Sequence, residues 1–269
     1  MEDKVKRLTD YLSSLGSAVI AFSGGVDSTL LALAAARALG DDVIAVTAVS
    51  PTLTAEEKAE CTALAERIGI KHIFLDSREM DDADFVRNDA QKCYYCKRVR
   101  MRQICDWAEE NGYAHVAEGS NTDDASDYRP GTKALAELSM IVSPLIEAGF
   151  TKADIRKLSR EWHLPTWNKE SAACLASRIA YGMTITEERL RQVEAGEKIV
   201  REYAEGQVRV RHHGEVARIE VEEAVLPVLM RSEVRREVAS RMKEIGFRYV
   251  TLDMVGYRMG SLNESLSKK

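Results

Sequence analysis

The segment that most constrains the fold is "SGGVDS", residues 23–28, which lies between two apolar runs. The run before it, "AVIAF" (18–22), has the length and the Val and Ile content of a buried strand. The run after it, "TLLALAAARAL" (29–39), is apolar nearly all round and stops at Gly40, as expected of a buried helix. A strand that leads through a glycine-rich loop into a helix is typical of an α/β protein.

Strand and helix patterns alternate along the first two thirds of the chain. We expect strands at 43–49, 71–76 and 115–119, and helices at about 95–111 and at 151–162. Thr54 and Glu57 have the spacing of a capping box for a further helix that ends at Gly69. This alternation predicts a parallel sheet with helices on both faces, which binds ligands at the carboxyl ends of its strands.

The regular alternation of predicted strands and helices ends near residue 180. We expect an amphipathic helix in "TEERLRQVEAGEKIVREYA", a hairpin in "QVRVRHHGEVARIEV" that turns at His213–Gly214, a long helix at about 222–245, and a strand at 249–255. The sequence therefore predicts an α/β domain over 1–180 and a small α+β domain over 181–269. We expect the second domain to serve substrate binding and oligomerisation.

Composition narrows the classes of function. The net charge of -5 argues against a nucleic-acid-binding protein and favours a small-molecule substrate. No run of 18 uncharged apolar residues occurs and the N-terminus lacks the pattern of a signal peptide, so we expect a cytoplasmic protein with no membrane partner. An odd set of five cysteines makes disulfides improbable. Cys61 and Cys105 fall on apolar helical stripes and are interpreted as core residues.

The loop at 23–28 has the features of an anion site, because backbone N–H groups and the helix dipole both point at it. Its glycines do not have the spacing of a Walker A loop or of a dinucleotide-binding G-x-G-x-x-G. Gly24 and Gly25 let the backbone close on a polyphosphate. Ser23 and Ser28 add hydroxyl donors, and Asp27 can hold Mg²⁺. The alternative is a tight glycine turn with no ligand.

Three cysteines outside the expected core are candidates for chemistry. Cys93 and Cys96 form a C-x-x-C pair at the head of a helix, which suits half a zinc site, a redox dithiol or part of an iron–sulfur site. Cys174 lies in a stretch of small residues, where a ligand could approach closely, and a buried structural cysteine is the alternative. Asp123 and Asp124 either coordinate Mg²⁺ or form turns.

The motif "FSGGVDS" resembles the signature of the PP-loop, or N-type, ATP pyrophosphatases. These enzymes have an adenine nucleotide alpha hydrolase-like fold, cleave ATP between the α and β phosphates, and transfer AMP to a substrate oxygen. The resemblance implies that the loop grips the departing pyrophosphate and stabilises charge that develops in the transition state. The residues implied to bind ATP are Ser23, Gly24, Gly25, Val26, Asp27, Ser28, Gly119 and Arg129, with Asp27 also on Mg²⁺.

A second resemblance extends over nearly the whole chain, from Ser23 to Asn263. The motifs "EGSNTDD", "YRPG", "SPL", "ACLASRIAYG", "VRVRHHGEVARIEV" and "GYRMGSLN" together resemble the LarE family of sulfur transferases, which act in nickel-pincer cofactor biosynthesis. The family reaction adenylates a carboxylate of pyridinium-3,5-biscarboxylic acid mononucleotide. A protein-bound sulfur then displaces AMP and leaves a thiocarboxylate.

The resemblance also assigns the cysteines. Some family members sacrifice the sulfur of a single cysteine at the position of Cys174, whereas others carry three cysteines and are thought to hold a [4Fe–4S] cluster whose open iron binds sulfide. Cys93, Cys96 and Cys174 are all present, so the chain resembles the cluster type and all three are implied to be catalytic, with Asp27. The three thiols are then expected to converge over the loop at 23–28. A zinc site with three ligands would also be open, and spacing does not exclude it.

The implied substrate carries two carboxylates and a phosphate, so arginines are expected in its pocket. The candidates are Arg129, Arg178, Arg209 and Arg211, of which Arg178 and Arg211, together with Ser177, are the predicted substrate-binding residues. For Arg209 we favour a solvated surface position. Strand alternation puts Arg209 and Arg211 on one face, which could simply face water.

Two other functions fit parts of the sequence. A PP-loop tRNA thiolase would use the same ATP and cluster chemistry on a base, but the acidic balance argues against an RNA-binding surface. A non-catalytic nucleotide-sensing module would use the cysteines only to bind structural zinc. We further expect a homo-oligomer.

Overall fold

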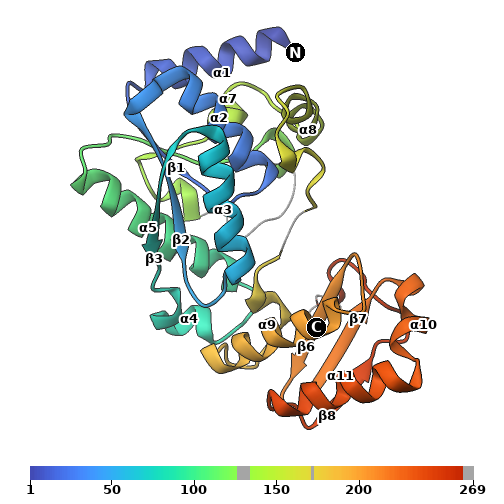
Figure 1. The fold of residues 1–269 in the computed structure, drawn as a ribbon. Helices are drawn as coiled ribbons and strands as arrows, with labels where there is room; N and C mark the ends of the chain where they lie inside the picture. The colour runs from blue at the N-terminus through green and yellow to red at the C-terminus, as the bar shows by residue number, and fades with distance from the viewer. Residues whose placement is uncertain (126–133, 171–172, 263–269) are drawn as a thin grey trace. The chain divides into compact units, whose positions relative to one another are not determined.

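The computed structural model describes residues 1–125, 134–170 and 173–262. The chain forms two compact units, drawn in Figure 1, and each of them is built from two stretches of sequence. Unit 1 contains Met1–Asp82 and Cys93–Ala172, and unit 2 contains Ala83–Lys92 and Ala173–Lys269.

Unit 1 is built on a five-stranded sheet in which every neighbouring pair is parallel. Its strands are β1 (Ala18–Ala21), β2 (Val43–Val49), β3 (Lys71–Asp76), β4 (Val116–Ala117) and β5 (Ile141–Val142), in the order β3-β2-β1-β4-β5. The order reverses between β1 and β4, so a crevice for ligands is expected at the carboxyl ends of these two strands. The parallel α/β architecture predicted from the sequence is confirmed.

Helices cover both faces of this sheet. The helices that unit 1 contributes are α1 (Glu2–Ser14), α2 (Val26–Leu39), α3 (Ala55–Ile68), α5 (Lys92–Glu110), α7 (Pro144–Glu147) and α8 (Lys152–Glu161). Along β1, Ala18 and Ile20 pack in the cluster formed with α1, α2, α3 and α8, whereas Val19 packs on the opposite face against α5. Figure 1 shows α2 and α3 along the strands on one side. The alternation of strand side chains therefore gives the sheet two apolar faces.

Local signals account for most helix ends. Thr54 and Glu57 form the predicted capping box of α3, which ends at Gly69 in the left-handed conformation. Thr151 and Asp154 form a second capping box at the start of α8. Helix α2 begins at Val26, three residues before the apolar run at 29–39, with Gly25 as its N-cap.

Unit 2 is built on a three-stranded sheet with helices packed on it. Its elements are α4 (Ala83–Val86), α9 (Glu187–Arg201), β6 (Val208–His213), β7 (Val216–Val221), α10 (Leu226–Leu229), α11 (Ser232–Glu244) and β8 (Tyr249–Leu252). Strands β6 and β7 form the predicted antiparallel hairpin, but its turn lies at Gly214–Glu215, one residue later than predicted, because His213 still pairs with Val216. Strand β8 pairs parallel to β7. The core contains Val208, Val210, Val221, Met242 and Phe247.

The long helix predicted at 222–245 is wrong. A 3-10 turn and the four-residue α10 precede α11, which begins only at Ser232. Pro227 lies in the first turn of α10, where its missing N–H is tolerated, and proline in a helix interior would remove a backbone hydrogen bond. The proline therefore starts a new helix instead of continuing one.

Within the described ranges, no helix combines the length and the apolar character that crossing a bilayer requires.

Candidate active site

The loop at 23–28 joins β1 to α2 and is held in a compact form. Gly24 has a φ of +65°, and a Cβ placed on it would lie 3.0 Å from Sγ of Cys61. The hydroxyl oxygens of Ser23 and Ser28 lie 3.1 Å apart. Gly25 caps α2 without any side-chain hydrogen bond, so the first N–H groups of this helix are not capped by a side chain. Such groups bind anions readily.

Asp27 lies in the first turn of α2, and its two carboxylate oxygens have different surroundings. Its Oδ2 accepts a hydrogen bond of 2.5 Å from Nζ of Lys152. Its Oδ1 is buried and has no hydrogen-bond partner among the residues that the structure describes. An orphaned carboxylate oxygen fits a hard cation such as Mg²⁺, so the residues present fit the predicted metal role.

Two lysines that sequence reasoning missed approach the loop. Lys152 is the first residue of α8 and pairs with Asp27. Lys169 donates to the carbonyl oxygen of Gly24 at 3.0 Å and to Glu60 at 2.7 Å. Lys152 begins a helix and Lys169 follows the 3-10 turn Pro165–Asn168, and at such positions a lysine usually indicates a solvated surface. Their positive charges suit a site for polyphosphate.

The segment after β4 approaches the same loop. A Cβ on Gly119 would lie 3.1 Å from the backbone nitrogen of Ser28, so glycine permits this close approach. The preceding Glu118 is 4% exposed and accepts hydrogen bonds from Ser120 at 2.7 Å and from Ser143 at 2.6 Å. The loops after β1 and β4 therefore meet where the strand order reverses.

The next two acidic residues, Asp123 and Asp124, make hydrogen bonds that stabilise the local backbone. Oδ2 of Asp124 accepts from the backbone N–H and the side-chain amide of Asn121, at 3.0 and 2.8 Å. Oδ2 of Asp123 accepts from the backbone N–H of Lys152 at 2.8 Å. These contacts favour the turn interpretation over Mg²⁺ binding. Arg129, which the sequence assigns to ATP, lies outside the described residues.

A buried polar cluster lies at the carboxyl ends of β2 and β3. Glu79 is fully buried, and its carboxylate accepts hydrogen bonds from Ser50 and Ser77 and pairs with Arg100 at 2.5 Å. Burial raises the pKa of Glu79, but the Arg100 guanidinium and the serine hydroxyls outweigh it and hold the pKa below its usual value. The cluster ties the loops after these strands to α5.

None of the five cysteines, all of which the structure describes, is in a disulfide. Cys61 and Cys105 are 1% and 5% exposed, which confirms that they are core residues. Cys93 is exposed and Cys96 is half-buried, one turn apart at the start of α5. The next residue, Lys97, lies 3.4 Å from Oε2 of Glu118, so this turn is linked to the loop that follows β4.

Cys174 belongs to unit 2 and is also half-buried, so it is not the buried structural cysteine of the alternative interpretation. It precedes the 3-10 turn Leu175–Arg178. Cys93 and Cys96 belong to unit 1. Within the described parts of the chain, no group of three His, Cys, Asp or Glu side chains could hold a metal ion. The convergence of the three thiols therefore stays a prediction.

Arg178, which the sequence assigns to the substrate, is 5% exposed and makes contacts within unit 2. Its guanidinium pairs with Glu197 at 2.8 Å and donates to the carbonyl oxygens of Ala173 and Cys174 and, at 3.1 Å, to the hydroxyl of Ser177. These contacts hold the backbone on both sides of the Cys174 side chain. In this structure Arg178 supports the turn that carries Cys174.

The expectation of a solvated Arg209 is wrong, because Arg209 and Arg211 are each only 6% exposed. The Tyr257 ring covers the Arg209 guanidinium at 5.1 Å. Burial, and then the positive charge of Arg178, lower the pKa of Arg209. Arg211 pairs at 2.8 Å with the fully buried Glu220. The polar face of β6 is therefore covered by the segment that follows β8.

Arg211 also reaches the turn that holds the predicted Ser177. Its Nη1 donates to the backbone carbonyl of Ser177 at 3.2 Å, and its Nη2 donates to Ser261 at 3.1 Å. Unit 2 thus brings the predicted substrate-binding residues Ser177, Arg178 and Arg211 together.

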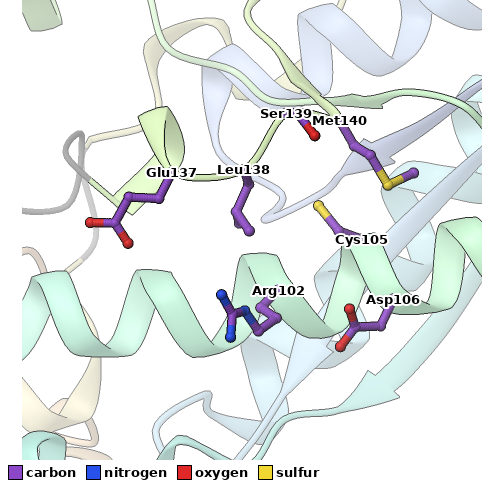
Figure 2. A pocket seen from close by; sticks show the side chains of 7 residues that line it. All are labelled: Arg102, Cys105, Asp106, Glu137, Leu138, Ser139 and Met140. Carbon is purple, nitrogen blue, oxygen red and sulfur yellow. The ribbon is translucent and has the colours of Figure 1, made fainter.

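A surface pocket of about 450 Å³ lies elsewhere in unit 1, as Figure 2 shows. It is lined by Arg102, Cys105, Asp106, Glu137, Leu138, Ser139 and Met140. None of the site residues predicted from the sequence lines it. The Cys105 thiol has its pKa raised to about 11, by burial and then by the charge of Asp106, so this thiol is not a nucleophile at neutral pH.

Comparison with known proteins places these features in a family. A sequence model of the NAD synthase family matches residues 1–178. Pyridinium-3,5-bisthiocarboxylic acid mononucleotide synthase of Lactiplantibacillus plantarum is 39% identical over 98% of this chain and 95% of its own length. An uncharacterized protein of Synechocystis is 39% identical over the full length of both chains. The NH(3)-dependent NAD(+) synthetase of Finegoldia magna is 30% identical, over 45% of this chain and 52% of its own length.

The family model covers the PP-loop, whereas the two 39% identical relatives also cover the residues of unit 2. The resemblance to the LarE family is therefore confirmed along the whole sequence. The protein belongs to the NAD synthase family of PP-loop proteins, in the branch of the pyridinium-3,5-bisthiocarboxylic acid mononucleotide synthase, and it is an ATP-dependent enzyme.

Proposed function

We propose that the protein is an ATP-dependent sulfur transferase that converts a carboxylate of pyridinium-3,5-biscarboxylic acid mononucleotide into a thiocarboxylate, in nickel-pincer cofactor biosynthesis. The observation that carries the proposal is the 39% identity to the bisthiocarboxylic acid mononucleotide synthase over both units, including the cysteine-bearing turn of unit 2. Relatives such as the NAD(+) synthetase match only 45% of the chain, so they support ATP chemistry without naming this substrate.

The first step is adenylation. A carboxylate oxygen of the substrate attacks the α-phosphorus of ATP, and pyrophosphate leaves. The glycine loop, the start of α2 and Lys152 would bind the leaving pyrophosphate, and the orphaned oxygen of Asp27 would hold Mg²⁺; the contact between Lys152 and Asp27 supports this assignment. Because charge accumulates on the leaving group, these contacts strengthen in the transition state.

The second step exchanges sulfur for oxygen. A sulfur nucleophile attacks the acyl carbon, and AMP leaves with the oxygen that belonged to the carboxylate. Arg178 holds the carbonyls around Cys174, so this turn would present its thiol in a fixed orientation. The buried Arg209 carries charge that would suit the substrate phosphate, whereas the charge of Arg211 is already paired with Glu220.

The sulfur source completes the proposal. Cys93, Cys96 and Cys174 would ligate a [4Fe–4S] cluster, whose fourth iron would be open to the sulfide that is transferred. The donor chemistry of three partly exposed thiols suits this group. The proposal requires the C-x-x-C turn and the Cys174 turn to come together over the loop at 23–28. We also propose a cytoplasmic homo-oligomer that acts on this small molecule and on no nucleic acid.

The test uses a substrate whose carboxylates carry isotopically labelled oxygen. Purified protein, incubated without oxygen with ATP, Mg²⁺ and sulfide, is expected to yield pyrophosphate, labelled AMP and the thiocarboxylate. Unlabelled AMP, or ADP and phosphate, would refute the adenylation of a carboxylate. The Asp27→Asn variant serves as the control for adventitious ATPase activity and is expected to release no pyrophosphate.

A further inference from the structure

The segment that leads into the C-x-x-C turn is fastened to the turn that carries Cys174. Residues 83–92 belong to unit 2, although the sequence on both sides of them belongs to unit 1. The short helix α4 lies beside the start of α9 in Figure 1, where the backbone N–H of Ile185 donates to the carbonyl of Val86 at 2.8 Å. The segment therefore folds together with residues that follow Cys174.

Asn88 is the centre of this attachment. It is fully buried and has a φ of +58°, in the left-handed region that few residues other than glycine adopt. Its side-chain amide lies within hydrogen-bond distance of the carbonyl oxygens of Ile179, Ala180 and Met183, at 3.2, 2.9 and 3.0 Å. Asparagine tolerates this backbone conformation and supplies these donors, whereas alanine would lose both advantages.

Lys92, the residue directly before Cys93, is also part of this attachment. Its side chain is buried, with 4% of the residue exposed. Nζ donates to Oδ1 of Asn88 at 2.8 Å and to the carbonyl oxygen of Ala176 at 3.1 Å, and it lies 4.5 Å from the centre of the Tyr181 ring. A buried ammonium is costly unless such partners satisfy it. The carbonyl it binds lies two residues after Cys174.

The Cys174 turn is consequently held from two directions. Arg178 binds the carbonyls of Ala173 and Cys174, and Lys92 binds the carbonyl of Ala176. Lys92 is also the first residue of α5 and is bonded covalently to Cys93. One buried side chain thus connects the backbone of the Cys174 turn to the backbone that enters the C-x-x-C pair.

We propose that Lys92 and Asn88 are positioning residues that fix the backbone leading into Cys93 against the turn that carries Cys174. The proposal rests on the proposed function, which requires these thiols to act together. If Lys92 only stabilised the fold, replacing it would lower the stability of the protein and leave the rate at which the two thiols meet unchanged.

The experiment measures that encounter directly. In a full-length Cys96→Ser protein, a copper–phenanthroline complex oxidises the Cys93 and Cys174 thiols to a disulfide, which peptide mass spectrometry under non-reducing conditions detects. Lys92→Met is expected to slow this reaction about tenfold or more, because small misplacements of reacting groups are costly in rate. Asn88→Ala is a second variant with the same expected effect. Circular dichroism checks that each variant is folded.

Lys4→Met is the matched control, because Lys4 also donates to a backbone carbonyl, that of Gly149 at 2.5 Å, within unit 1. It is expected to lower stability and leave the disulfide rate unchanged. An unchanged rate in folded Lys92→Met would overturn the inference and leave the proposed function standing. If the parent forms no Cys93–Cys174 disulfide, the convergence of thiols fails and both proposals fall, while pyrophosphate release still tests adenylation separately.

Discussion

The ammonium nitrogen of Lys152 lies 2.5 Å from Oδ2 of Asp27, although 125 positions separate the two residues in the sequence. The capped start of α8 delivers the lysine to the glycine loop, and the second oxygen of Asp27 remains buried beside it. A cation and the carboxylate that we propose to bind Mg²⁺ therefore share the place where pyrophosphate is expected to leave.

Lys152→Met is expected to lower the rate of pyrophosphate release about a hundredfold, because a donor proposed to bind the leaving group is lost and Asp27 loses its ionic partner. Lys157→Met, an exposed residue of the same helix, is the control and should have the activity of the wild type. The measurement is a coupled pyrophosphate assay at saturating ATP. Equal rates in the two variants would exclude a role for Lys152 in this step.

Gly24→Ala is expected to destabilise the protein by more than Gly16→Ala. Both glycines have a positive φ, of 65° and 70°, which costs an L-residue about 1–2 kcal/mol. Only at Gly24 would the new Cβ also meet an atom, Sγ of Cys61 at 3.0 Å, whereas nothing lies within 4 Å at Gly16. Urea unfolding measures both costs. Adding Cys61→Ala should recover part of the loss at Gly24 in a double-mutant cycle and none at Gly16.

Arg178→Met is expected to cost about 3–5 kcal/mol, because it leaves Glu197 buried without its ionic partner. The pair is nearly buried, with side-chain exposures of 7% and 8%. Arg241→Met removes an exposed pair with Glu202 at 2.6 Å and should cost much less, because water screens such a pair. The free energy of unfolding is the readout. Glu197→Gln in the Arg178→Met background should restore part of the stability, and no restoration would contradict this explanation.

Unit 2 is expected to lose stability in mildly acidic solution because of His212. Burial, and then the charges of Arg189 and His213, lower the pKa of His212 from 6.5 to about 4. The neutral ring is the one that fits, since Nδ1 accepts a hydrogen bond from the Gly214 N–H at 3.2 Å. The unfolded chain binds this proton first, so the stabilisation is present above pH 6.5 and is lost as the pH falls towards about 4.

The size of this loss is on the order of 3 kcal/mol. Amide hydrogen exchange in β6 should report it, because this strand carries His212. His212→Gln is expected to be less stable than the wild type at neutral pH, with the gap closing as the pH falls. A gap that stays constant with pH would indicate that His212 contributes packing alone.

Alkylation should separate the cysteines into two classes. Under native conditions at neutral pH, iodoacetamide is expected to modify the exposed Cys93 and to spare Cys61 and Cys105. Both of these thiols are buried, and burial raises their pKa. Peptide mass spectrometry gives the fraction modified at each site, and denaturant should abolish the difference. Rapid native modification of Cys105 would contradict its place in the core.

The features that local sequence determines were predicted well. The capping box at Thr54 and the glycine at the end of α3 depend on residues within a few positions of one another. The same holds for the hairpin, although its turn lies at Gly214–Glu215, one residue after the predicted position. The glycine loop after a short apolar strand likewise placed the candidate site at a strand end. Such patterns are sufficient because the physics that produces them acts over one or two turns of chain.

The parts that sequence did not predict depend on distant contacts. Lys152 and Lys169 look like solvated helix-end lysines until the fold carries them to the glycine loop. Arg209 was expected in water because strand alternation says nothing about Tyr257, which covers it from another segment. Asn88 gave no signal at all, since its partners come from residues 91 to 95 positions further along the chain.

The assignment of residues 83–92 to unit 2 has a consequence for how this enzyme could have been assembled in evolution. The polypeptide passes between the units three times. A single gene fusion at residue 172 would add residues 173–269 without residues 83–92, which complete the same unit. A fragment ending there would leave the Asn88 amide without the carbonyl oxygens of Ile179, Ala180 and Met183. Neither fragment of such a split would contain the whole of unit 2.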